Sequence, residues 1–234
     1  VQLMQTRSKY IKQLENLEGY LTRLSEKTVA DIRAAGSALA GNAEAADAVL
    51  QGRNVEDRLR TEIERECLDI MLLQQPLVAG DLRFVSGAFR AVSDIAHIDS
   101  KTRDVAYLAQ NMPAEATAGL QENFAALAER TANMVETAYR AFSEADEEAA
   151  REVFAMDDAV DELYHKTAAS VVEIIRASKE SSEIDYLPEL LMVAKYFERM
   201  GDDAQRVADW ALFRVTGEHD VYSAQRKGAD NAGE

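Results

Sequence analysis

Residues that break helices are rare and widely spaced in this chain. Its 234 residues include three prolines and eleven glycines. In the intervals between them apolar residues recur every three to four positions, as in Val153, Met156, Val160 and Leu163. This spacing places apolar side chains on one face of a helix. The pattern therefore predicts an all-α protein.

The breakers divide the chain into six expected helices and two similar halves. The helices are expected at roughly 4–39, 43–75, 81–110, 115–143, 146–179 and 184–216. Short connections imply that consecutive helices run antiparallel. The last three helices repeat the first three at an interval of roughly 100 residues. We therefore expect two tandem three-helix bundles, at 1–112 and 113–217, followed by a disordered polar tail at 218–234.

Charge and composition limit the classes of partner and compartment. The formal net charge is −16 at pH 7, which argues against nucleic acid and fits basic proteins or divalent cations better. Cys67 is the one cysteine in the sequence, so no intrachain disulfide can form. No apolar run of about 18 residues and no N-terminal signal-peptide pattern occur in the sequence. We expect a soluble, cytoplasmic protein.

Two pairs of carboxylates lie on the last two expected helices. Asp157 and Asp161 are four residues apart, as are Glu198 and Asp202, so the members of each pair share a helix face. At about 100° per residue, both pairs fall on the same edge of the apolar stripe of their helix. Asp161 and Asp202 each lie about 30 Å from the turn that joins these antiparallel helices.

These positions predict that the four carboxylates meet in one groove on the flank of the second bundle. Carboxylates brought together without a cation repel one another, so the cluster favours a bound metal ion or protons. A ligand set made only of oxygen suits Mg²⁺, Ca²⁺, Mn²⁺ or oxidised iron. A solvated acidic edge of the bundle is the alternative interpretation of the same pattern.

The corresponding groove of the first bundle has lost most of its carboxylates. Alignment of the two halves places Arg53 and Asp57 at the positions of the aspartate pair. It places Ala96 and Ser100 at the positions of Glu198 and its partner. One carboxylate remains, beside an arginine that could neutralise it. The sequence therefore predicts a poor metal site in the first bundle.

We interpret two other titratable residues, Asp99 and His165, as structural residues and not as metal ligands. Asp99 points toward the apolar stripe of its helix, and Arg103, four residues on, is its expected ion-pair partner. His165 falls at about 140° from the stripe and faces outward. The motif from Glu162 to His165 matches the Glu-x-x-His of ferritin-like di-iron bundles, but that site needs two such motifs facing inward. We therefore expect His165 to be a surface histidine.

Two segments carry a resemblance to a known family. The segment QQPLVAGDLR at 74–83 resembles the QQPVAxDLR segment of the PhoU family, and AKYFERMGDDA at 194–204 is similar to its second-bundle signature. The resemblance spans nearly the whole chain. It implies two tandem three-helix bundles that bind metal clusters through Glu/Asp-x-x-x-Asp motifs. It also implies a cytoplasmic accessory regulator of phosphate-specific ABC transport.

The resemblance implies the metal residues as well. In the second bundle they are Asp157, Asp161, Glu198 and Asp202, with Asp203, where the family often has histidine, assisting. The metal implied is iron, manganese, magnesium or zinc. In the first bundle the family's DLERIGD is replaced by DIAHIDS at 94–100, which lacks the glutamate and the closing aspartate. We therefore do not expect metal binding to be symmetric.

The function implied is regulation by binding. The implied partners are the ATPase of the phosphate ABC transporter and a phosphate-sensing histidine kinase, with a homodimer as the implied assembly. The metal could serve structure, peripheral membrane association or sensing. The sequence contains no Gly-rich phosphate loop and no nucleophile–base pattern, so we expect no enzymatic activity. A metal-dependent hydrolase, a metal-storage protein and a metal-free partner-binding paralogue are the alternatives.

Overall fold

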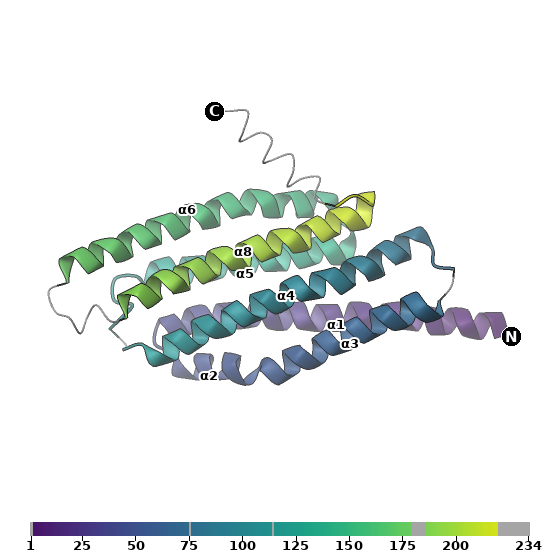
Figure 1. Ribbon diagram of the computed structural model, residues 1–234, viewed down its shortest axis with the longest axis horizontal. Helices are drawn as coiled ribbons and strands as arrows, with labels where there is room; N and C mark the ends of the chain where they lie inside the picture. The colour runs from purple at the N-terminus through teal and green to yellow at the C-terminus, as the bar shows by residue number, and fades with distance from the viewer. Residues whose placement is uncertain (1, 75, 114, 179–185, 220–234) are drawn as a thin grey trace, which may run out of the picture.

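The chain folds into long helices that run along one common direction (Figure 1). The structure, a computed structural model, describes residues 2–74, 76–113, 115–178 and 186–219. All elements within these residues are helical, which confirms the predicted all-α class. They are α1 (Gln2–Leu39), α2 (Ala43–Gln51), α3 (Arg53–Leu73), α4 (Ala79–Asn111), α5 (Gln121–Glu144), α6 (Glu147–Ala177) and α8 (Leu187–Thr216).

Two of the predicted helix boundaries are wrong. The helix expected at 43–75 is divided at Gly52 into α2 and α3. A side chain at Gly52 would meet Nζ of Lys27 on α1, so the end of that lysine side chain would have to move. The helix expected from 115 begins at Gln121, because the preceding residues form turns in which Gly119 has a φ of 77°.

Other expected boundaries lie outside the described residues. The helix ends expected at 179 and 184 fall there, as does most of the tail expected to be disordered. The last described helix, α8, ends where predicted, because Gly217 adopts the left-handed conformation that closes a helix.

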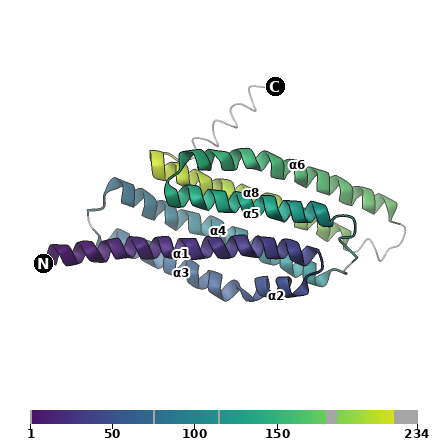
Figure 2. The same ribbon diagram turned by 180° about the vertical axis from the view of Figure 1, so that it is seen from behind.

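The helices form four layers, as Figures 1 and 2 show from opposite sides. The two inner layers are α1 with α4 and α5 with α8. In the contact between them, α1 packs on α5 and α4 packs on α8. The outer layers are α2 with α3 on one flank and α6 on the other. The two halves of the chain therefore lie side by side, with α3 and α6 in corresponding places.

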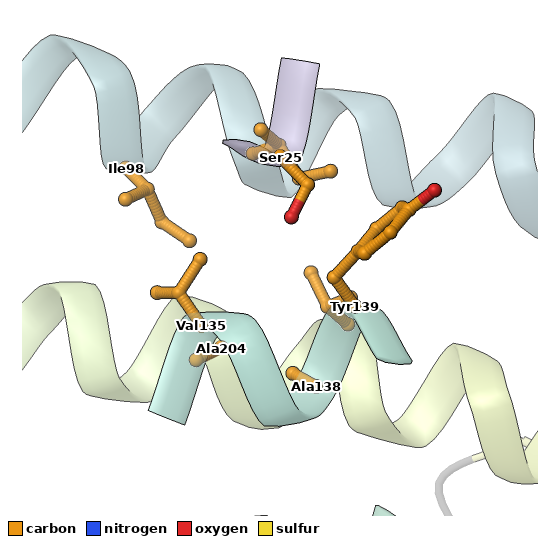
Figure 3. Close-up of a pocket in the computed structure, with 8 residues that line it drawn as sticks. Ser25, Ile98, Val135, Ala138, Tyr139 and Ala204 are labelled. Atoms are coloured by element: carbon orange, nitrogen blue, oxygen red, sulfur yellow. The ribbon is translucent and has the colours of Figure 1, made fainter. Parts of the chain in front are cut away.

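The buried apolar side chains form one main core that continues through both halves. Its largest fully buried members include Phe124, Phe142, Phe154 and Phe197. Each such side chain contributes about 1.5–3 kcal/mol when it leaves water. A cavity of about 10 Å³ remains where the four inner helices meet, lined by Ser25, Ile98, Val135, Tyr139 and Ala204 among others (Figure 3). It is at the lower limit for one water molecule, so this cavity has no room for a larger ligand.

Candidate metal site in the second bundle

The packing of α6 against α8 positions the four predicted carboxylates of the second bundle. Helix α6 begins at Asp146, whose side chain accepts a hydrogen bond from the Ala149 amide at 3.0 Å. This cap stabilises the start of a helix that is amphipathic over its whole length. Helix α8 has Pro188 in its first turn, where the missing amide proton costs nothing.

Asp157 lies against the backbone of α8. It is buried, with 6% of its surface exposed. A Cβ atom at Gly201 would lie 3.4 Å from Asp157 Oδ1 and 3.5 Å from Met134 Sδ on α5. Any side chain longer than a methyl group at position 201 would compete with the carboxylate for this space. The glycine of the Glu-Arg-Met-Gly-Asp motif therefore makes room for a carboxylate of α6, a role that we did not predict.

The other three carboxylates share one electrostatic environment. The pKa of Asp161 is raised first by burial and next by the charge of Glu198, and the same two causes come first in raising the pKa of Asp202. Asp161 also contributes to the raised pKa of Asp202. The positive charge of Lys195 opposes the shift at both aspartates. The charges of these three side chains therefore act on one another. That all four carboxylates meet at one metal ion stays a prediction.

Glu198 acts on both of these aspartates, and its two oxygens differ. Oε1 accepts a hydrogen bond from Lys195 Nζ at 2.7 Å. Oε2 is buried and has no hydrogen-bond donor among the described residues. A buried carboxylate oxygen without a donor is unfavourable, because it has lost its hydration. The residues present therefore fit a cation, which would supply the missing positive charge at this oxygen.

Asp203, the fifth predicted ligand, lies on the side of α8 that faces α4. It is buried and accepts hydrogen bonds from Lys101 Nζ at 2.6 Å and from Arg206 Nη1 at 2.7 Å. A ligand atom from each of Asp94, His97 and Asp203 lies within 4.8 Å of the other two. Two cations already neutralise the Asp203 carboxylate, so the structure ties this residue into the contact between α4 and α8.

The groove of the first bundle differs as predicted. Asp57 forms an ion pair with Arg53 at 3.6 Å, and both side chains are exposed. Ala96 lines a cavity of about 30 Å³, together with Asp57 and Asp99 and with two arginines. The second bundle has a glutamate at the position of Ala96. Asp57, the carboxylate at the position of Asp161, is therefore paired with a basic side chain of its own helix.

The expected pair between Asp99 and Arg103 is wrong. Arg103 pairs with Glu56 of α3, and the buried Asp99 accepts a hydrogen bond from Thr28 Oγ1 of α1 at 2.6 Å. Burial raises the pKa of Asp99 to about 7. The Asp99 side chain projects inward from α4 toward α1, as predicted. To reach Arg103 on its own helix, the carboxylate would have to turn away from Thr28.

Glu56 is the centre of an ion-pair network in the first bundle. It is 4% exposed and pairs with Arg103 of α4 and with Lys27 of α1, the latter at 3.6 Å. Lys27 also pairs with Asp31 on its own helix. Basic side chains of the protein thus occupy the interior where three helices meet. Sequence patterns on single helices could not reveal these pairs, because each pair that holds Glu56 joins different helices.

None of the described helices is both long and apolar enough to cross a membrane.

Comparison with known proteins gives consistent matches over both halves. The model of the PhoU domain matches residues 21–109 and again residues 124–211. A phosphate-specific transport system accessory protein PhoU homolog of Aquifex aeolicus is 30% identical over 211 residues, covering 90% of this chain and 94% of that protein. The homolog from Clostridium acetobutylicum is 26% identical over 213 residues, covering 91% of this chain and 96% of its own length.

Two solved structures have the same fold. The crystal structure of PhoU from Pseudomonas aeruginosa superposes with a TM-score of 0.81 at 22% identity, covering 89% of this chain and all (100%) of that one. The phosphate transport system regulatory protein PhoU from Streptococcus pneumoniae gives a TM-score of 0.79 at 20% identity, over 90% of this chain and 98% of that one. The predicted architecture of tandem helical bundles is therefore confirmed.

Proposed function

The chain belongs to the PhoU family, and on that premise we propose that it is a cytoplasmic regulator of phosphate uptake and phosphate signalling. It acts by binding other proteins and holds a metal ion in its second bundle. Its relatives are named as accessory proteins of the phosphate-specific transport system, which supports the role in phosphate transport. The metal site rests on this chain's own residues.

One observation carries the metal site: the buried Oε2 of Glu198 has no donor among the described residues, in a cluster that already contains Asp161 and Asp202. Asp157, Asp161, Glu198 and Asp202 would hold the ion, which is iron, manganese, magnesium or zinc. When bound, it would neutralise the cluster and join α6 to α8. Asp203 would not bind it directly, because Lys101 and Arg206 hold its carboxylate.

Elemental analysis tests the metal site. We expect the purified chain to contain iron, manganese or another divalent metal in the amount of one site per chain. The double variant Asp157→Ala/Glu198→Ala should lose it. If the wild-type chain contains no metal, even after loading, the metal site is refuted and the protein is a metal-free binding module.

The partners follow from the family role. We propose that the chain binds the ATPase of the phosphate ABC transporter, the phosphate-sensing histidine kinase, or both, as a homodimer. Affinity capture of each purified partner by the metal-loaded chain tests this, with the metal-stripped chain in parallel. If neither partner is captured under either condition, the regulatory proposal fails. Light scattering of the free chain tests the dimer separately.

We propose binding rather than catalysis. Lys195, the cation beside the cluster, is held by Glu198, and Arg199 of the same motif is exposed. A hydrolase would need a positively charged group aimed at its substrate, in addition to metal ligands. A phosphatase assay with Mn²⁺ tests the point, and a rate that disappears in Glu198→Ala would contradict it.

A further inference from the structure

Lys195 forms an ion pair with Glu198. It lies one turn before Glu198 on α8, and its Nζ is 2.7 Å from Glu198 Oε1. The ammonium also lies 5.0 Å from the ring centroid of Tyr164 on α6. The side chain is 35% exposed and that of Glu198 is 15% exposed. The pair is therefore partly shielded from water, in which ion pairs are weak.

The site contains more negative charge than Lys195 can balance. Asp161, Glu198 and Asp202 interact with one another, and Lys195 acts on both aspartates. A divalent ion would compensate this charge better than one ammonium group. Such an ion would need the oxygens of Glu198, of which Lys195 occupies one. The ammonium and the metal would thus compete for the same carboxylate.

We propose that Lys195 is a built-in competitor of the metal and sets the metal affinity of the site. This inference rests on the metal site proposed above and adds the residue that regulates it. Metal binding would weaken the contact of Lys195 with Glu198. The ring of Tyr164, which the ammonium already faces, would continue to attract it through a cation–π interaction.

The first bundle supports this interpretation, because basic side chains of the chain already pair with its carboxylates. At the edge that corresponds to the metal groove Arg53 pairs with Asp57, and in the interior beside this edge Arg103 and Lys27 pair with Glu56. This fold therefore accommodates basic side chains where carboxylates gather between helices. In the second bundle Lys195 pairs with Glu198, and all four carboxylates are retained.

A titration of the full-length, metal-stripped chain with Mn²⁺ tests the inference. Lys195→Met keeps most of the side-chain volume and removes the charge. We expect it to bind Mn²⁺ about fivefold more tightly than the wild type, since one partly exposed ion pair is worth ~1 kcal/mol. Lys195→Arg keeps the charge and should bind like the wild type. Lys166→Met removes an equal charge from an exposed site on α6 and should leave the affinity unchanged.

The outcomes separate the inference from the proposed site. If the wild type binds Mn²⁺ and Lys195→Met binds it equally or more weakly, Lys195 does not compete and the inference is overturned, while the metal site stands. If no variant binds Mn²⁺, both fail together. A second measurement uses no metal: Lys195→Met should lower the melting temperature of the stripped chain at pH 7, relative to Lys166→Met. An unchanged melting temperature would show that Lys195 does not neutralise the cluster.

Discussion

Asp99 gives the sharpest test of the electrostatics of the first bundle. Asp99 is 4% exposed, and its carboxyl group accepts a hydrogen bond from Thr28 Oγ1. Burial raises its pKa most, the charges of Asp31 and Asp57 raise it further, and Thr28 and Lys27 oppose the shift. Replacement by asparagine keeps an oxygen for the Thr28 hydroxyl and removes the titrating group.

The magnitude follows from the pKa of about 7 in the folded chain, compared with an ordinary value of 3.8. Because the folded state holds the proton more tightly, the stability that Asp99 contributes is fully present below pH 4 and is lost as the pH rises toward 7. At ~1.4 kcal/mol per pKa unit, the complete loss is at most about 4 kcal/mol. Between pH 5 and pH 8 it amounts to roughly 2–3 kcal/mol.

Urea denaturation of the wild type and Asp99→Asn at pH 5 and pH 8 measures this effect. We expect the variant to gain roughly 2–3 kcal/mol relative to the wild type between these two pH values. Asp104→Asn, which removes an exposed carboxylate from the same helix, should differ from the wild type by less than about 0.5 kcal/mol at both. An equal difference between Asp99→Asn and the wild type at both pH values would refute the argument.

Three further substitutions test the packing that positions the site. Gly36→Ala should destabilise the chain by about 1–2 kcal/mol in urea denaturation, because its Cβ would lie 2.5 Å from Ala128 Cβ and push α1 off α5; a stabilised variant would contradict this contact. Lys101→Met should cost about 1–3 kcal/mol, because the buried Asp203 then keeps one cation of two; no loss of stability would mean that this pair contributes nothing. Gly201→Val should reduce Mn²⁺ loading, because its methyl groups need the space of the buried aspartate of α6; full loading would exclude the role of this glycine.

Helical periodicity predicted the class and order of the elements because long amphipathic stripes are local information. It could not predict the break at Gly52, which has ordinary right-handed dihedral angles and no proline beside it. At this break Gly52 lies against the Lys27 side chain of α1, whose ammonium group pairs with Glu56. This contact joins two different helices, so the pattern within either helix does not indicate it.

For the candidate site, too, spacing predicted the features that lie within one helix and missed those that depend on packing between helices. Spacing within one helix predicted which carboxylates share a face, and Asp161, Glu198 and Asp202 do interact. Spacing could not predict that Asp203 faces Lys101 on α4, because that depends on how the two halves pack. Lys195 could have been found, since it precedes Glu198 by three residues and such pairs meet on a helix surface. The metal itself stays a prediction.

The two halves balance the charge of their clustered carboxylates in different ways. Each gathers carboxylates where its outer helix packs on an inner one, and each must balance their charge. In the first half Lys27, Arg53 and Arg103 do so from within the chain. In the second half Lys195 reaches one oxygen of Glu198 and leaves the other without a donor among the described residues. We therefore expect a cation from solution to bind the second half more tightly than the first. Its arrival would act on the contact between α6 and α8 and leave the network of the first bundle unchanged, so we expect the response to metal to be confined to one half of the molecule.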